Sequence, residues 1–269
     1  MKKYLVGTAL GNLMLGASQY SSLKSLSARN PETASMVANA VLADRLITRL
    51  CPDGGVFVDV GAHIGSIFSA AHANGRNLTI HAIEADPDKA KSLAQRFAYV
   101  TLHACAVGEG SGQIEFYRNP QATGYNSLVQ DDTAEQVAIC VEIKTLDTLL
   151  ADVAPDVMKI DIEGAELGAL RGGAGVIGAH RPTIMFESTQ LGTNSLGYSP
   201  ELLWEWFSGQ GYGIYVPDRV AHGAPPMALE TFLDGHEYPM RTLNYFAVHG
   251  DRRLAVRDRA RTILGVRAT

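Results

Sequence analysis

Short apolar runs alternate with amphipathic segments along the chain from about residue 56. β-Branched and aromatic residues fill the runs, and Gly, Pro or Asp bound them, which is typical of buried strands. The runs lie at residues 56–60, 78–86, 100–107, 157–161, 183–187, 213–217 and 241–249, with helical patterns at 66–75, 87–98, 165–178 and 199–212. This alternation predicts an α/β fold, a mostly parallel, Rossmann-like seven-stranded sheet with helices on both faces.

Residues 108–156 interrupt the alternation between the third and fourth runs. Segments 113–117 (QIEFY) and 137–144 (VAICVEIK) have strand character, and residues 146–151 predict a short helix. We therefore expect an inserted β-ribbon. A long excursion beside a binding crevice often serves as a lid or specificity element, and an extension of the sheet edge is the alternative.

The two ends of the chain lie outside this pattern. At 269 residues, we expect a helical cover over 1–50, one domain over 51–250 and a helical tail over 251–269. Residues 1–19 have the lysines and apolar stretch of an export signal, but Asn12 and several glycines interrupt them, which favours a covering helix. The sequence predicts no membrane span. The tail mixes Arg with apolar residues, as does an amphipathic helix packed on the domain or on a second subunit of a homo-oligomer.

The composition and charge of the chain limit the classes of partner it is expected to bind. The hydrophobic content is 46%, the charged content 19% and the net charge −5, with no dense basic tract before the last twenty residues. Nucleic-acid binding is therefore not expected, because neutralising phosphates needs clustered Lys and Arg. The cysteines Cys51, Cys105 and Cys140 are odd in number and scattered, which predicts reduced thiols and a cytoplasmic location.

The loop after the first strand is the candidate cofactor loop, because ligands of open α/β sheets bind beyond the carboxyl ends of the strands. It runs VDVGAHIGS over residues 58–66 and contains Asp59, Gly61, Ala62, His63, Gly65 and Ser66. Nicotinamide dinucleotides prefer G-x-G-x-x-G, whereas this loop has G-x-x-x-G after an acid. That acid repels a pyrophosphate but suits an ammonium group. The loop therefore favours S-adenosylmethionine over NAD.

The ends of the second and third strands extend this prediction. Glu84 lies nineteen residues past Gly65, where a carboxylate accepts hydrogen bonds from both ribose hydroxyls, with Ala85 next to it. A solvated glutamate is the alternative. Ala106 and Val107 are placed to form the wall of an adenine slot, although apolar residues there also suit a core.

Together these segments resemble the FkbM-type S-adenosylmethionine-dependent methyltransferases. The resemblance rests on FVDVGAHIGS, IEADP, AVGEGSG, GYNSL, VEIKTLDTLL, MKIDIEGAELGALRGG and IMFE, in order, over residues 56–187. It implies the class I methyltransferase fold and O-methylation, often of sugar hydroxyls. It also suggests that Asn126 and Ser127 close over the cofactor or contact the acceptor. His63 is a departure, since the family commonly has Asn there, and residues 1–50 and 190–269 carry no family motif.

The acids after the fourth strand are candidates for catalysis, because this strand neighbours the first. A carboxylate within hydrogen-bond reach of an alkyl hydroxyl can take its proton during attack on a methyl group. We assign Asp161 to this junction as base or orienting group. Glu163 is the rival base, with a loop-fixing role as its alternative, and His63 is the second choice.

Neighbouring charged residues have structural interpretations. Lys159 lies in an apolar strand and must be paired, so we expect a salt bridge with Glu187 rather than a catalytic role. Glu166 falls in a first helical turn, where an acid stabilises the helix dipole. His222 and His236 lie in a Gly/Pro-rich loop, where surface positions are favoured over an acceptor wall.

Several alternatives stay open. Asp161, Glu163 and Glu187 are oxygen ligands suitable for Mg²⁺, as in catechol-type methyltransferases, but the Asp-Asn pair expected near the fifth strand is missing, so a metal is not favoured. Methylation of amines is disfavoured because DIEG stands where Asn/Asp-Pro-Pro-Tyr/Phe is expected. A non-catalytic S-adenosylmethionine-binding or NAD-binding protein is the remaining alternative to an O-methyltransferase acting on a small hydroxylated acceptor.

Overall fold

The computed structural model describes residues 6, 8, 21, 25, 28–74, 77–120, 126–129, 135–189 and 192–266. Most of the helical cover expected over residues 1–19 lies outside these ranges. Within them, every helix is too short or too polar to cross a bilayer.

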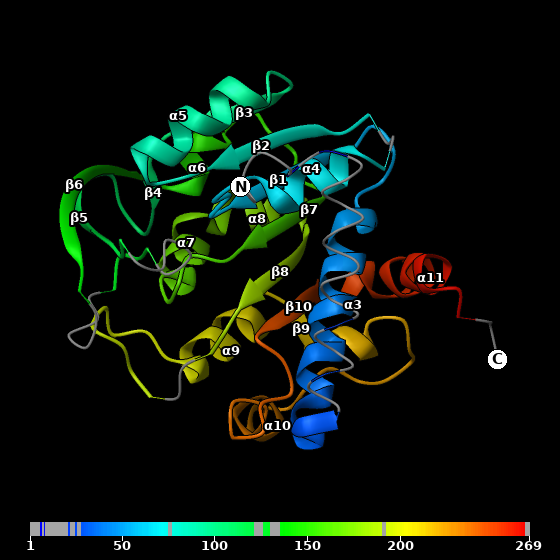
Figure 1. The fold of residues 1–269 in the computed structure, drawn as a ribbon. Helices are drawn as coiled ribbons and strands as arrows, with labels where there is room; N and C mark the ends of the chain where they lie inside the picture. The colour runs from blue at the N-terminus through cyan, green and yellow to red at the C-terminus, as the bar shows by residue number, and fades with distance from the viewer. Residues whose placement is uncertain are drawn as a thin grey trace.

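A seven-stranded sheet forms the centre of the molecule (Figure 1). Its strands are β1 (Val56–Val60), β2 (Thr79–Ile83), β3 (Val100–His103), β7 (Val157–Ile160), β8 (Thr183–Glu187), β9 (Tyr212–Tyr215) and β10 (Asn244–His249), in the order β3-β2-β1-β7-β8-β10-β9. Neighbours from β3 through β8 pair in parallel, while β10 is antiparallel to both β8 and β9. The predicted mostly parallel, Rossmann-like sheet is confirmed. Because the strand order reverses beside β1, a binding crevice is expected at its carboxyl end.

Helices cover both faces of the sheet, as the alternation of apolar residues along the strands requires. Val58 and Ile160 point to a face covered by α6 (Leu146–Leu149), α7 (Glu166–Gly172), α8 (Ala174–His180), α9 (Pro200–Gly209) and α10 (Leu229–Asp234). Phe57 and Val157 point to the opposite face, covered by α3 (Ala34–Leu50), α4 (Ser66–His72), α5 (Pro87–Arg96) and α11 (Arg253–Leu264). Both faces of the sheet are therefore buried against continuous apolar surfaces of the helices.

The first and last described helices pack against each other on the second face. Helix α3 contacts α4, β10 and α11, and in Figure 1 it runs across the front of the sheet. The Arg259 side chain of α11 donates to the carbonyl of Cys51 at 2.6 Å, just past the end of α3. The amphipathic tail helix predicted from the sequence thus packs on its own chain. Short 3-10 helices, η1 (Pro31–Thr33), η3 (Pro217–Arg219) and η4 (Gly250–Arg252), join these elements.

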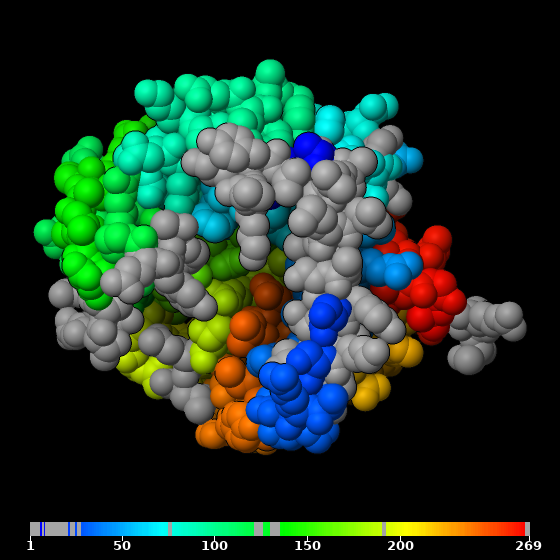
Figure 2. Space-filling view, viewed as in Figure 1, coloured from blue at the N-terminus to red at the C-terminus, as the bar shows by residue number. Residues whose placement is uncertain are grey.

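The insertion forms a separate ribbon. Strands β5 (Gly112–Arg118) and β6 (Val137–Lys144) pair antiparallel, and the short β4 (Ala106–Val107) joins β6 in parallel. The predicted β-ribbon is confirmed, and the expected short helix is α6, which Thr145 caps by accepting from the backbone N–H of Thr148. In Figure 2 the ribbon (green) and α11 (red) lie at opposite ends of the face shown.

Two expected elements are each divided in the structure. The third apolar run predicts one strand, but β3 ends at His103 and β4 belongs to the ribbon sheet. The helix expected over 165–178 breaks at Gly173 into α7 and α8. A Cβ at the neighbouring Gly172 would lie 2.0 Å from the carbonyl oxygen of Gly108, so the backbones approach too closely there for any side chain.

Candidate functional site

The loops after β1 and β7 meet at the carboxyl edge of the sheet. Gly61 has φ +79°, and a Cβ on it would lie 2.0 Å from the carbonyl oxygen of Asp161. Gly65 has φ +83° at the start of α4, and a Cβ there would lie 2.6 Å from the Phe68 ring. The two predicted loop glycines therefore allow a close approach that a side chain would block.

A cavity of about 100 Å³ opens beside these loops, and we call it the strand-end cavity. The sequence-predicted residues lining it are Gly61, His63, Glu84, Ala85, Ala106, Val107, Asn126, Asp161 and Glu163. Val60, Ile83, Lys89, Cys105, Phe116, Leu128 and Ile162 also line it. The wall therefore combines ionisable or polar side chains with apolar ones.

Glu84 is buried in the wall of the strand-end cavity. Its two carboxylate oxygens accept backbone N–H groups of His63 at 2.7 Å and of Asp86 at 2.9 Å. Burial raises the pKa of Glu84, while Lys89 and these two N–H groups oppose the rise. A carboxylate has about four acceptor positions, so two stay available to hydroxyl groups of a ligand.

His63 has φ 51° and borders the same cavity. Its Nε2 is buried without a hydrogen-bond partner among the described residues. Burial, together with the charges of Lys89 and Lys159, lowers the pKa of His63 to about 4. The ring is therefore neutral at pH 7, and it is suited to hydrogen bonding rather than to strong proton abstraction.

Lys159 lies between two acids in the centre of the site. Its Nζ is 3.3 Å from an oxygen of Asp59 and 3.3 Å from an oxygen of Asp161, and it donates to the Gly61 carbonyl at 3.0 Å. Burial opposes the ammonium charge, but the two carboxylates outweigh it and raise the pKa of Lys159. The expected salt bridge with Glu187 is wrong, because the register places Asp59 directly opposite Lys159 on β1.

The loop after β7 is held in shape by Glu166. This carboxylate is buried and accepts the backbone N–H groups of Ile162 at 2.9 Å and Gly164 at 3.3 Å. The loop it fixes carries Glu163 at φ 57°, a conformation uncommon outside Gly and Asn. Glu166 lies in the first turn of α7, as the sequence predicted, and its hydrogen bonds to the loop are an additional role.

A second cavity of about 380 Å³ lies beyond this loop, and we call it the glutamate cavity. Its lining residues include Ser127, Glu163, Glu166, Glu187, Ser188, Asn194 and Tyr198. Burial raises the pKa of Glu163 to about 7, and the charges of Asp161 and Glu166 add to this. Burial and the charge of Asp161 raise the pKa of Glu187 to about 9, so this carboxyl is protonated at pH 7.

Asp161, Glu163 and Glu187 gather at the junction of the two cavities. Each offers one carboxylate oxygen, and these three atoms lie within 4.8 Å of one another. Three oxygens at this spacing suit a divalent cation, and they also suit a set of acids that share protons. The arrangement brings together the two predicted bases and the third residue of the magnesium alternative.

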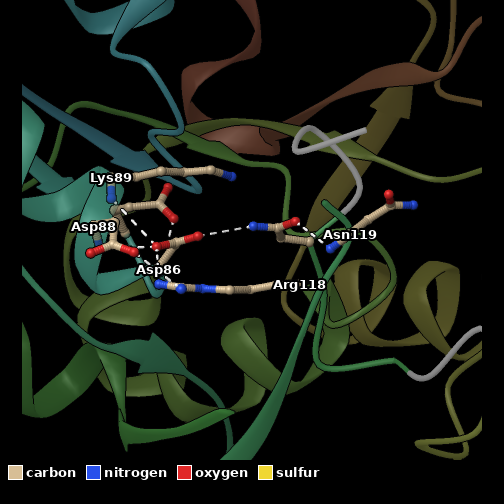
Figure 3. A network of polar contacts seen from close by, with 7 residues as sticks. Asp86, Asp88, Lys89, Arg118 and Asn119 are labelled. Carbon is tan, nitrogen blue, oxygen red and sulfur yellow. Dashed lines mark hydrogen bonds and ion pairs between the residues drawn. The ribbon is translucent and has the colours of Figure 1, made fainter. Parts of the chain in front are cut away.

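A polar network joins the ribbon to the start of α5 (Figure 3). Asp86 caps α5 by accepting from the N–H groups of Asp88 and Lys89, and it also pairs with Arg118 at 2.6 Å. Asn126 donates to the other oxygen of Asp86 at 3.1 Å, while Arg118 reaches Asp88 at 3.1 Å. Ribbon residues are thereby fixed beside the strand-end cavity.

Asn126 and Ser127, which the sequence assigns to the cofactor or acceptor, separate toward the two cavities. Asn126 lines the strand-end cavity and Ser127 lines the glutamate cavity. The Ser127 hydroxyl donates to the Glu163 carbonyl at 2.7 Å, so the insertion contacts the loop after β7 directly. Their contacts with ligands stay predictions.

Six predicted site residues do not line the strand-end cavity: Asp59, Ala62, Gly65, Ser66, Ser127 and Lys159. Asp59 and Ala62 are buried, Asp59 against Lys159 and Ala62 in the core under α4, and Ser66 starts α4 outside the wall. Asp59 therefore contacts Lys159 rather than the cavity surface, and its role toward a cofactor stays a prediction. Sequence reasoning missed Lys89, Cys105, Phe116 and Leu128, although Leu128 ends the quoted GYNSL segment.

His236 also differs from the expectation of a surface position. It is 5% exposed, and its Nε2 lies 2.7 Å from the hydroxyl oxygen of Ser188, a lining residue of the glutamate cavity. The packing of α10 beneath β8 and β10 buries it, and a Gly/Pro-rich local sequence gives no sign of that packing.

Comparison with known proteins places the chain in a family. The model of the methyltransferase FkbM domain matches residues 59–214. "Methyltransferase 1" of Beauveria bassiana is 24% identical over 147 residues, 45% of this chain and 59% of that protein. A methyltransferase FkbM structure from Methylobacillus flagellatus has a TM-score of 0.47 and 21% identity over 74% of this chain and 44% of that one. A precorrin-6y C5,15-methyltransferase structure from Geobacter metallireducens has a TM-score of 0.40 and 18% identity over 66% of this chain and 72% of that one. Because the family model covers more than half of the sequence, the chain belongs to the S-adenosylmethionine-dependent FkbM methyltransferase family.

Proposed function

We propose that this protein is an O-methyltransferase that moves a methyl group from S-adenosylmethionine to a hydroxyl of a small metabolite, a sugar or a glycosylated natural product. One observation carries the proposal: Glu163 borders both the strand-end cavity and the glutamate cavity, next to Asp161. A donor in the first cavity and an acceptor in the second would meet at these two carboxylates.

The strand-end cavity has groups that fit S-adenosylmethionine. The Glu84 carboxylate suits the ribose hydroxyls, and Ala106, Val107 and Phe116 offer an apolar wall for adenine. The unpartnered Nε2 of His63 offers a hydrogen bond to a polar group of the ligand. When bound, this cofactor supplies an electrophilic methyl group.

The residues at the junction act on the acceptor hydroxyl. Asp161 is held by the ion pair with Lys159 at 3.3 Å, which fixes its position as an orienting group or base. Glu163 has a pKa of about 7, which matches a general base working near neutral pH. Holding the hydroxyl in line with the methyl group supplies much of the remaining rate enhancement.

The glutamate cavity also limits the charge of the acceptor. Its described lining residues contain acids, hydroxyls and amides but neither Lys nor Arg. A phosphate or carboxylate on the acceptor would find no basic partner among these residues, and an unpaired anion costs free energy in a partly buried site. Neutral polyhydroxylated acceptors therefore fit better than phosphorylated or uronic sugars.

Calorimetry tests the cofactor half of the proposal. We expect S-adenosylhomocysteine to bind and NAD not to bind, because the loop lacks a pyrophosphate cradle.

A screen of hydroxylated acceptors, read by the mass gain of one methylene, tests the transfer half of the proposal. Asp161→Asn should reduce turnover severely while leaving the melting temperature near that of the parent. Tight binding of NAD alone, or undiminished turnover in Asp161→Asn, would contradict the assignment.

The magnesium-dependent mechanism is the second candidate, because the oxygens of Asp161, Glu163 and Glu187 lie within 4.8 Å of one another. A cation there would bind and acidify the acceptor hydroxyl. We favour the metal-free form and expect methyl transfer to survive exhaustive treatment with EDTA. Loss of activity under EDTA, with recovery on adding Mg²⁺, would favour the second candidate.

A further inference from the structure

A buried pair, Ser188 and His236, lies at the wall of the glutamate cavity, and none of the roles above uses it. Ser188 directly follows Glu187 at the end of β8, is 7% exposed and lines the cavity. His236 follows α10 and lies behind Ser188, outside the lining of the cavity. A hydroxyl in the wall of a proposed acceptor site can contact the acceptor directly.

The hydrogen bonds of His236 fix which of its nitrogens carries the proton. Its Nδ1 lies 2.8 Å from the backbone carbonyl oxygen of Phe232, and a carbonyl only accepts. Nδ1 therefore carries the proton of the neutral ring, and Nε2 is bare. At 2.7 Å from Nε2, the Ser188 hydroxyl must be the donor of that hydrogen bond.

Packing holds the imidazole in this orientation. The ring meets Phe232 edge-on, with centroids 4.8 Å apart, and stacks on Tyr245 at 5.5 Å. Burial lowers the pKa of His236, which keeps the ring neutral near pH 7. Since the ring cannot turn without losing these contacts, the direction of the Ser188 O–H bond is fixed as well.

Because the Ser188 hydrogen is committed to His236, its oxygen can act toward the cavity only as an acceptor. We propose that Ser188 selects acceptors carrying a hydroxyl donor next to the one that is methylated, so that the substrate class is a vicinal diol or polyol. His236 is the positioning residue for this contact. The inference rests on the proposed function and deepens it.

The hydrogen bond between Ser188 and His236 accounts for the burial of these two polar side chains. Buried hydroxyls and imidazoles are costly unless they are hydrogen-bonded, and each satisfies the other here. A purely structural pair would meet the same requirement. The difference is that a selecting pair changes the discrimination between acceptors, whereas a structural pair changes only stability.

The tautomer is tested first, on the full chain with S-adenosylhomocysteine, by nitrogen NMR of isotopically labelled histidine at pH 7. The His236 signal is assigned by its loss in His236→Phe, which keeps an aromatic ring between Phe232 and Tyr245. We expect a protonated Nδ1 and a bare Nε2, with the Nε2 resonance shifted in Ser188→Ala. A protonated Nε2 would overturn the inference.

Kinetics then test the selection. The probes are the methyl hexoside that is methylated fastest in a screen and its monodeoxyfluoro analogues, in which fluorine replaces each neighbouring hydroxyl and cannot donate. In the parent protein we expect one analogue to lose about three- to tenfold in kcat/KM, the usual effect of one hydrogen bond. Ser188→Ala should abolish that difference, and Ser188→Thr should restore most of it.

A matched control separates this effect from lost stability. Thr48→Val removes another buried hydroxyl, on α3, which hydrogen-bonds to the Asp44 carbonyl within the same helix and lies outside both cavities. It should leave the discrimination ratio unchanged. Unchanged discrimination in Ser188→Ala, with transfer intact, overturns the inference but leaves the proposed function standing. If no hexoside is methylated, or if S-adenosylhomocysteine does not bind, the proposed function and this inference both fail.

Discussion

Replacing Gly61 by alanine tests whether the close contact between the loops after β1 and β7 organises the site. A Cβ at this position would lie 2.0 Å from the Asp161 carbonyl oxygen, where about 3 Å is the practical limit for such contacts. The two loops would therefore have to separate by about 1 Å. Asp161 and Glu163, which line the strand-end cavity, would move with the loops.

The free-energy cost has two parts. Gly61 has φ +79°, and a left-handed conformation costs an L-residue about 1–2 kcal/mol. Overpacking against fixed backbone adds about 1–3 kcal/mol. Gly54→Ala is the matched control, because Gly54 has φ +72° but a Cβ there would meet nothing within 4 Å. The control should lose only the first part, so the difference between the two variants isolates the clash.

Urea denaturation measures the stability of both variants, and calorimetry with S-adenosylhomocysteine measures their affinity. We expect Gly61→Ala to lose about 2–5 kcal/mol of unfolding free energy, and Gly54→Ala about 1–2 kcal/mol. Because Gly61 lines the strand-end cavity and Gly54 does not, the affinity should fall in Gly61→Ala alone. A displacement of about 1 Å should also cost up to about a hundredfold in the rate of methyl transfer. Equal losses of stability, with parental affinity in both, would refute the reasoning.

Three further predictions follow from charges in the site. Glu163 must be deprotonated to accept a proton, so kcat should rise with pH through about 7, and Glu163→Gln should remove that inflection from the pH profile. Burial gives Glu187 a pKa of about 9 in the native state against 4.5 for the ordinary group, so native protein retains a proton that the unfolded chain releases. Stability in urea should therefore fall as pH rises between these values, and Glu187→Gln should flatten the fall. Arg118→Ala removes the ion pairs with Asp86 and Asp88, so hydrogen exchange should accelerate in β5; Arg171→Ala, which breaks a comparable pair with Glu109, should leave β5 unchanged.

The sheet was accessible from the sequence because its strands are continuous apolar runs bounded by turn residues. The pairing of the charges inside it was not. Lys159 faces Asp59 because β1 and β7 pair with that register, and a register between strands about a hundred residues apart leaves no local sequence signal. The glutamate expected to pair with it, Glu187, instead adds to the acid group around Asp161.

The candidate site divides in the same way. Gly61, His63, Glu84 and Asp161 were found because strand ends of a parallel sheet meet at one edge, and all four line the strand-end cavity. Phe116 was missed, because its place in that wall depends on how the ribbon folds back. His236 was missed for a related reason, since tertiary packing alone buries it.

Glu163 is the single described residue that the strand-end and glutamate cavities share. Substitutions can therefore change the lining of one cavity while leaving the lining of the other almost unchanged. Exchanging Thr189, Tyr198 or Leu203 would remodel the glutamate cavity without altering a side chain that lines the strand-end cavity. Asn194 should be kept, because its side-chain amide donates to the Gly164 carbonyl at 2.7 Å and supports the loop that carries Glu163. Under the proposed function, new acceptor preferences can arise on this scaffold while the groups that recognise the cofactor stay unchanged.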